Sequence, residues 1–189
     1  MKNTHLLTTK KLVISGLLAA LTVIGSSLRI TLPLDIAGTT SFHLGNNFCA
    51  LCGILLGPWL GGLAAGLGSA IYDMLNPLYI SEAWITFLMK GAYGLAAGLV
   101  IRAGSQNIGY FKTLLASIAG ALTYAVLYLA KSYFYSGLLI HGLTPSAAAL
   151  TVLSKLPATA FNAVVAVIAA PLLATAVRKV LEKSHLSVD

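Results

Sequence analysis

The stretch LGNNFCALCGILLGPWLGGLAAGLGSAIY, residues 44–72, runs for 29 residues without a charged side chain. It contains one Gly57-Pro58 turn and is followed directly by Asp73, and a further apolar run carries Lys90. Apolar segments joined by a short turn are typical of a membrane protein, in which a helical span needs about 20 apolar residues. Because a charge inside hydrocarbon is costly, the ionisable residues of such a chain indicate where its function lies.

The composition of the whole chain excludes an ordinary soluble domain. Hydrophobic residues make up 58% and charged residues only 9%, whereas a soluble domain carries about 25% charged residues. The 189 residues have room for six spans of roughly 20 residues and little else. We therefore predict an all-α integral membrane protein, a six-helix bundle that forms a single domain over residues 1–189.

Apolar runs and turn residues give the boundaries of the six spans. We predict spans at about 12–28, 44–56, 59–75, 83–101, 111–134 and 155–181, with outer loops at about 30–43, 76–83 and 135–150. The last apolar segment is too long for one straight span. We expect Pro157 and Pro171 to break it into a short outer helix and the sixth span.

Basic residues set the predicted orientation. With six spans, eight of the twelve lysines and arginines fall on one side, and four lie elsewhere near the opposite face. The larger group comprises Lys2, Lys10, Lys11, Arg102, Lys112, Arg178, Lys179 and Lys183. The positive-inside rule then places both termini in the cytoplasm, and a net charge of +7 distributed in this way does not indicate a nucleic-acid partner.

Small residues at four-residue spacing indicate where helices approach closely. Gly62-x-x-x-Gly66 and Gly94-x-x-x-Gly98 fit packing inside the bundle. The first span has two such pairs, Ser15 with Ala19 and Gly16 with Ala20. A small-residue stripe on a terminal helix also suits docking to another membrane protein.

Polar side chains line one face of each of three predicted spans, at i, i+4 and i+7 spacing. The three faces are Thr86, Lys90 and Tyr93; Tyr124, Tyr128, Lys131 and Tyr135; and Lys155, Thr159 and Asn162. In the predicted orientation all three faces lie in the outer half of the membrane. We predict that they surround a cavity that opens outward.

Simpler interpretations remain open for the groups near the span ends. Tyr133 and Tyr135 fit the interfacial aromatic belt of a membrane protein. Lys131 and Lys155 are able to extend to the outer surface without binding anything.

The deeper polar groups also have structural alternatives. Lys90 fits an ion pair with Asp73 of the neighbouring span, and Asn162 fits a bond to a neighbouring helix. His43 and Asn46 fit the cap of the second span. The common depth of these groups favours the cavity.

Motifs of the well-known enzyme classes are missing from the sequence: it has no H-E-x-x-H, G-x-S-x-G or Walker motif. The four histidines lack metal-ligand spacing, and Cys49 and Cys52 fit small packing residues of an apolar helix. We therefore expect no enzymatic activity, no bound metal and no cofactor.

Several short motifs follow one another along residues 43–91: His43-Leu-Gly-Asn46, Leu55-Leu-Gly-Pro58, Gly61-Gly62, Gly66-x-Gly68-Ser69, Asp73 and Thr86-Phe-x-x-x-Lys90-Gly91. In this order and spacing they resemble the substrate-binding S-components of energy-coupling factor (ECF) transporters. The specific match covers about residues 40–104, and the remainder agrees in span number and length.

The resemblance implies a multi-pass protein of the bacterial plasma membrane that captures a vitamin on the outer side. It implies a membrane scaffold subunit and two ATPase subunits as partners, with ATP hydrolysed by those subunits. The family's docking motif for the scaffold is an alanine pair in the first span, and the equivalents here are Ser15, Gly16, Ala19 and Ala20. The family's ligand-covering loops correspond to residues 30–43, 76–84 and 135–150.

The expected vitamin-binding residues are those of the predicted cavity: His43, Asn46, Thr86, Lys90, Tyr93, Tyr128, Lys131, Tyr135, Lys155 and Asn162. Two unpaired cations, Lys131 and Lys155, favour a carboxylate such as pantothenate. The tyrosines equally suit the ring of hydroxymethylpyrimidine, pyridoxine or riboflavin. We expect pantothenate, with these ring-containing vitamins as the alternatives. Two other classes remain as alternatives: a stand-alone channel or secondary carrier, for which no internal repeat is found, and a membrane enzyme or assembly factor.

Overall fold

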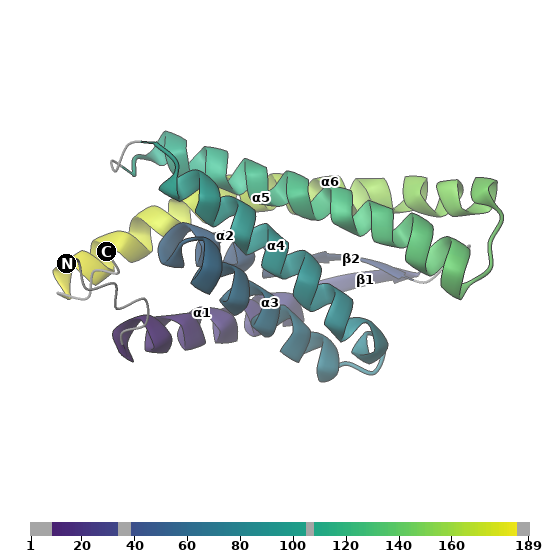
Figure 1. Cartoon of the computed structure of the whole chain (residues 1–189), viewed down its shortest axis with the longest axis horizontal. Coiled ribbons are helices and arrows are strands. Elements are labelled where there is room, and N and C mark those ends of the chain that lie inside the picture. Colours follow the sequence, from purple (N-terminus) through teal and green to yellow (C-terminus); the bar gives the residue numbers. More distant parts are fainter. Residues whose placement is uncertain (1–8, 34–38, 105–107, 185–189) are drawn as a thin grey trace, which may run out of the picture.

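The computed structural model describes residues 9–33, 39–104 and 108–184. Within these ranges the chain is mostly helical, with one two-stranded hairpin (Figure 1). The α-helices are α1 (Thr9–Ser27), α2 (Gly45–Leu56), α3 (Pro58–Met74), α4 (Ala83–Arg102), α5 (Tyr110–Ala130) and α6 (Pro145–Lys183). A 3₁₀ turn, η1 (Ile80–Glu82), precedes α4, and a π-helix, η2 (Lys131–Ile140), continues α5.

Four helical segments of the described chain are long and apolar enough to cross a membrane: Thr9–Ser27, Ile80–Arg102, Tyr110–Ile140 and Pro145–Leu181. Their outer faces carry exposed large apolar side chains such as Leu17, Leu88, Val126 and Leu172. Exposed apolar surface of this extent indicates a hydrocarbon environment. The predominantly helical membrane fold agrees with the sequence prediction.

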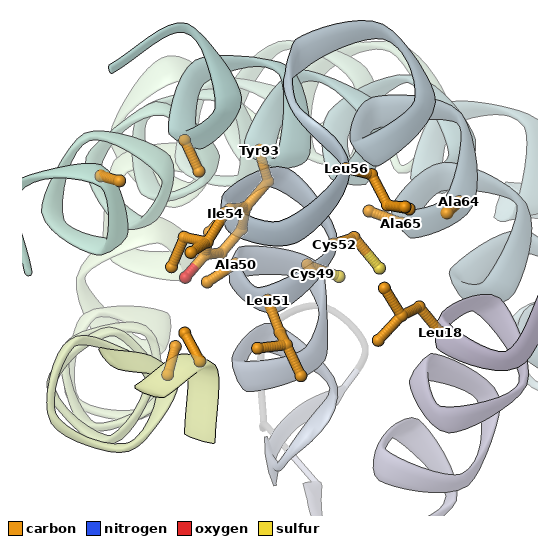
Figure 2. Close-up of a cluster of buried hydrophobic side chains, with 14 of the residues drawn as sticks. Leu18, Cys49, Ala50, Leu51, Cys52, Ile54, Leu56, Ala64, Ala65 and Tyr93 are labelled. Carbon is orange, nitrogen blue, oxygen red and sulfur yellow. The ribbon is translucent and has the colours of Figure 1, made fainter. Parts of the chain in front are cut away.

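Helix α2 lies at the centre of the bundle. Ten of its twelve residues are buried, as expected for a helix that is apolar on all sides. Figure 2 shows its buried side chains, Cys49, Cys52 and Ile54 among them, surrounded by neighbouring helices. Gly57, with φ of 78°, makes the turn into α3, and Pro58 occupies the first turn of that helix, where a missing N–H costs nothing.

Helices α3 and α4 pack at backbone contact because glycines face each other. A Cβ atom at Gly62 would lie 3.0 Å from the Gly91 carbonyl oxygen, and one at Gly94 would lie 2.6 Å from the Gly61 carbonyl oxygen. A Cβ at Gly66 would lie 2.8 Å from the carbonyl oxygen of Phe87. The predicted small-residue pairs of these spans therefore join helices of one chain.

The first outer loop, predicted as irregular over 30–43, instead contains a β-hairpin. Strand β1 (Arg29–Pro33) pairs antiparallel with β2 (Thr39–His43), with Arg29 opposite His43 and Thr31 opposite Ser41. The strands contain β-branched and aromatic residues, Ile30, Thr31, Thr39, Thr40 and Phe42, which favour extended backbone. Pro33 stands at the end of β1, where it interrupts no central ladder.

The outer loop predicted at 135–150 is also shorter than expected. The π-helix extends to Ile140, and α6 begins at Pro145. The expected breaks at Pro157 and Pro171 do not occur, since α6 is a single 39-residue helix. Membrane helices tolerate proline because neighbouring groups are able to satisfy the freed backbone atoms.

The ends of the elements form two groups (Figure 1). The start of α1, the α4–α5 connection and the end of α6 lie at one end of the molecule, and the hairpin and the α5–α6 connection lie at the other. The basic residues Lys10, Lys11, Arg102, Lys112, Arg178, Lys179 and Lys183 belong to the first group of segments.

Candidate functional site

A cavity of about 330 Å³ lies among the hairpin, η1 and helices α3 to α6. Its volume falls within the range of about 300–1,000 Å³ that is typical of small-molecule sites. Seven of the ten predicted binding residues line it: His43, Thr86, Lys90, Tyr128, Lys131, Lys155 and Asn162. The other three, Asn46, Tyr93 and Tyr135, lie outside its lining.

Lys90 is held in the wall of the cavity by an amide and an aromatic ring. Its buried ammonium group donates to Asn46 Oδ1 and lies 3.8 Å from the centre of the Tyr124 ring. The expected ion pair with Asp73 is not formed: within the described ranges, the one ion pair joins Lys131 and Glu82. Asp73 and Thr86 both line the cavity, and Asn46 holds Lys90 from outside it.

Two further lysines have different partners. Lys131, at the start of the π-helix, forms an ion pair with Glu82 of η1 at 2.5 Å. Lys155 of α6 is buried, lies 3.5 Å from Ser132 Oγ and is 5.8 Å from the centre of the Tyr128 ring. The premise that both are unpaired cations is thus wrong for Lys131, because η1 brings a carboxylate to it.

A ladder of tyrosines forms the aromatic side of the site. Tyr124 and Tyr128 stack with ring centres 5.7 Å apart and planes 20° from parallel, and both line the cavity. Tyr93 lies behind them, 6.1 Å from Tyr124 and fully buried. Tyr135 points elsewhere and packs edge-on against Trp84, which fits the interfacial-belt interpretation better than a ligand contact.

Asn162 ties the hairpin to α6. Its Nδ2 donates to the carbonyl oxygen of Ser41 at 2.7 Å, and its Oδ1 accepts from the backbone N–H of His43 at 3.0 Å. Phe42 adds an edge-to-face contact with Phe161, with ring centres 4.9 Å apart. The amide of Asn162 therefore holds β2 over the cavity, and the hairpin becomes one of its walls.

His43 lies at the join between β2 and α2. Burial lowers the pKa of His43 well below its ordinary value, and the positive charges of Lys90 and Arg29 lower it further. The imidazole is therefore neutral at pH 7. Its Nδ1 accepts from the backbone N–H of Gly45 at 3.2 Å, which assigns the ring proton to Nε2.

Arg29 and Tyr79 are cavity residues that the sequence analysis did not select. The Arg29 guanidinium lies between two rings, 4.5 Å from the centre of Tyr72 and 4.6 Å from that of Tyr79. The Tyr79 hydroxyl lies 3.4 Å from both the Thr39 and the Ser41 hydroxyl. Burial raises the pKa of Tyr79, but hydrogen bonds to hairpin hydroxyls and the charge of Arg29 outweigh it and give a net lowering.

The position of these residues explains why they were missed. Arg29 and Tyr79 lie in segments predicted as loops, outside the helical faces used to select candidates. The sequence feature that could have identified Arg29 is its position as the single cation between two apolar segments, residues 12–28 and 44–72.

Comparison with known proteins identifies the family. The profile described as "ECF-type riboflavin transporter, S component" matches residues 6–179. The chain belongs to this family. An S component is the substrate-binding subunit of a vitamin-uptake transporter, and the family agrees with the resemblance seen in the sequence.

Two relatives give no further detail of function. A Pyrococcus woesei protein described as "Uncharacterized protein in gap 3'region" is 31% identical over 118 residues, which are 62% of this S component and 74% of the relative. A "UPF0397 protein" of Streptococcus gordonii is 33% identical over 93 residues, which are 49% of this chain and 47% of the relative.

The cavity of this S component carries an excess of positive charge. Four cationic side chains line it, Arg29, Lys90, Lys131 and Lys155, against two carboxylates, Asp73 and Glu82. Two histidines, His43 and His141, also line the cavity, and with both counted as neutral the formal excess is two positive charges. Such a site favours a ligand that supplies negative charge or electron-rich acceptor atoms.

The small residues of α1 lie on two different faces. Ala19 packs against α3, since a Cβ at Gly68 would lie 2.4 Å from its carbonyl oxygen. Ser15 is half-buried and bonds the carbonyl oxygen of Lys11 at 2.7 Å. Gly16 and Ala20 are exposed, and a Cβ at Gly16 would meet no atom within 4 Å.

Both cysteines are buried and have free thiols. Cys49 Sγ lies 3.6 Å from Ser69 Oγ, and Cys52 Sγ lies 3.7 Å from Thr22 Oγ1. Within the described ranges, no group of three His, Cys, Asp or Glu side chains is placed to hold a metal ion.

Proposed function

We propose that this S component is the high-affinity receptor of an ATP-driven ECF-type importer in a bacterial plasma membrane. Its chain crosses the membrane six times, and the cavity opens to the outside. The observation that carries the proposal is a cavity of about 330 Å³ with charged and aromatic walls inside an otherwise apolar bundle.

The distribution of basic residues supports this orientation. The segments with most of the lysines and arginines gather at the end opposite the hairpin (Figure 1), so the positive-inside rule puts both termini in the cytoplasm. Helix α2 has only 12 residues and rises about 18 Å. The hairpin completes its path, and non-helical backbone is tolerated at membrane depth where it lines a cavity.

Transport by this protein depends on other subunits. The chain binds the vitamin, and an ECF scaffold subunit with two ATPase subunits supplies the energy. Gly16 and Ala20 form the scaffold-docking face, because they are the exposed pair of the four candidates. Gly16→Leu should leave vitamin binding intact and weaken co-purification with the scaffold subunit, whereas unchanged co-purification would exclude this face.

Two kinds of vitamin fit the site. Riboflavin fits the stacked Tyr124–Tyr128 pair and the name of the family, as do the smaller rings of hydroxymethylpyrimidine and pyridoxine. Pantothenate fits the excess of two positive charges and the buried Lys155, although Lys131 no longer supports it. The ring and the carboxylate would use different parts of one cavity.

Binding and uptake measurements test the proposal together. Purified protein should bind one of these vitamins saturably in isothermal titration, and cells should accumulate it only when scaffold and ATPase subunits are co-expressed. Failure to bind any vitamin would exclude a receptor function. Accumulation by the chain alone would instead indicate a stand-alone carrier.

A further inference from the structure

One buried hydroxyl group in the cavity has no partner. Ser136 of the π-helix is 6% exposed and lines the cavity, and its Oγ makes no hydrogen bond within the described part of the chain. A buried hydroxyl without a partner is costly. In a binding cavity, such a group is available to a ligand atom.

The buried Lys155 ammonium group lines the same cavity. It is 5% exposed, and its hydrogen-bond partner among the described residues is Ser132 Oγ, at a long 3.5 Å. It takes no part in the single ion pair of the described residues, which joins Lys131 and Glu82. An ammonium group has three donors, so Lys155 retains donors for a ligand.

The π-helix brings the two groups to one corner of the cavity. Ser132 and Ser136 are four residues apart and share a helical face, and the next residue, Gly137, packs against α6. A Cβ at Gly137 would lie 2.9 Å from Ala148 Cβ. The distance of 3.5 Å between Ser132 Oγ and Lys155 Nζ shows that the face with the serines lies against the helix that carries Lys155, and Ser136 and Lys155 line the same cavity. π-helical turns often occur at functional sites.

We propose that Lys155 and Ser136 form an oxyanion subsite that binds a carboxylate or phosphate group of the ligand. The subsite rests on the proposed function and specifies its ligand: a vitamin, or vitamin ester, with an anionic oxygen group at the π-helix corner and its remaining atoms against Tyr128. Both protein groups are donors, so an acceptor with negative charge satisfies them together. The same group offsets part of the cavity's positive excess.

Matched pairs of ligands test this subsite. Isothermal titration of the purified full-length protein compares pantothenate with pantothenol, flavin mononucleotide with riboflavin, and pyridoxal phosphate with pyridoxal. One charged member should bind at least about tenfold more tightly than its neutral partner. The first pair reports a carboxylate, and the other two report a phosphate.

Two substitutions locate the group that is bound. Ser136→Ala and Lys155→Met should each weaken binding of the charged ligand by about tenfold or more and reduce the preference for charge. Ser154→Ala and Lys179→Met, which change exposed residues of α6, are the controls and should change neither. Ser136→Ala removes a hydroxyl with no protein partner, so its melting temperature should not fall, and this variant stays informative if Lys155→Met does not fold.

The outcomes separate this inference from the proposed function. Equal binding of charged and neutral partners, a preference that survives in both variants, or binding only of an uncharged vitamin would overturn the subsite and leave the receptor function standing. Absence of binding by every vitamin would overturn both.

Discussion

The amide of Asn162 should hold the β-hairpin closed, and Asn162→Leu tests this directly. Leucine has a similar volume but removes the 2.7 Å bond to the Ser41 carbonyl and the 3.0 Å bond from the His43 N–H. Each lost bond costs about 1 kcal/mol, or more if the backbone group stays dry. The two together should cost about 2–4 kcal/mol. Contacts such as Phe42 with Phe161 remain, so we expect the hairpin to open locally and the helical bundle to stay folded.

Hydrogen exchange measures this opening without knowledge of the ligand. A cost of 2–4 kcal/mol corresponds to exchange of the β2 amides that is faster by about 30-fold to 1,000-fold. Amides of α2 and α3 should keep their protection, because the hairpin opens separately from the core. Val164→Leu, on the exposed side of α6, is the control and should behave as wild type. Unchanged β2 exchange in Asn162→Leu would refute the reasoning.

Three further results are expected. Gly66→Val should lower the unfolding free energy by about 1–3 kcal/mol, since a Cβ there would lie 2.8 Å from a carbonyl oxygen of α4. The control Gly16→Val, at an open position, should not lower it, and equal effects of the two variants in thermal unfolding would contradict the close packing of α3 on α4. The pKa of His43 is lowered on folding, so below about pH 6.5 the unfolded state binds more protons than the folded state, and stability should fall as the pH decreases from there. Unfolding curves at several pH values should show a weaker fall in His43→Gln, and an identical fall in this variant would show that another group is responsible. A double-mutant cycle of Glu82→Gln and Lys131→Met should give a coupling free energy of about 1 kcal/mol, because the carboxylate is 34% exposed; zero coupling would mean that the pair does not form.

The sequence was sufficient for the first five helices and for most of the cavity wall, but not for the single helix α6. Helical spacing placed Lys90, Lys131 and Lys155 on faces that converge, because period 3.6 is a property of the backbone and needs no tertiary information. The short buried α2 and the turn at Gly57 were evident from local composition, because residues 44–72 have no charge and one Gly-Pro break.

Partners within the site were not predictable to the same degree. Asp73 was expected beside Lys90 because both lie near the same ends of adjacent spans, but an amide and a tyrosine ring hold that lysine instead. Glu82 was assigned to a loop, so its pairing with Lys131 could not be anticipated. Such choices depend on ångström-scale side-chain placement, which periodicity does not specify.

Irregular segments account for the remaining differences. The hairpin depends on pairing between residues 29–33 and 39–43, and strand pairing is a tertiary property. Proline at 157 argued for a break, but the helix continues through it, and membrane helices tolerate proline in this way. The π-helix that carries Ser136 has no distinct sequence pattern.

Native mass spectrometry of the detergent-purified protein tests the central claim, that the cavity is a vitamin site, most directly. One vitamin molecule per chain should be retained by the wild type and lost from Thr86→Trp, in which a large ring replaces a small side chain of the cavity wall. A vitamin retained equally by Thr86→Trp would contradict the assignment of this cavity, as would a wild-type protein to which no vitamin binds when vitamins are added.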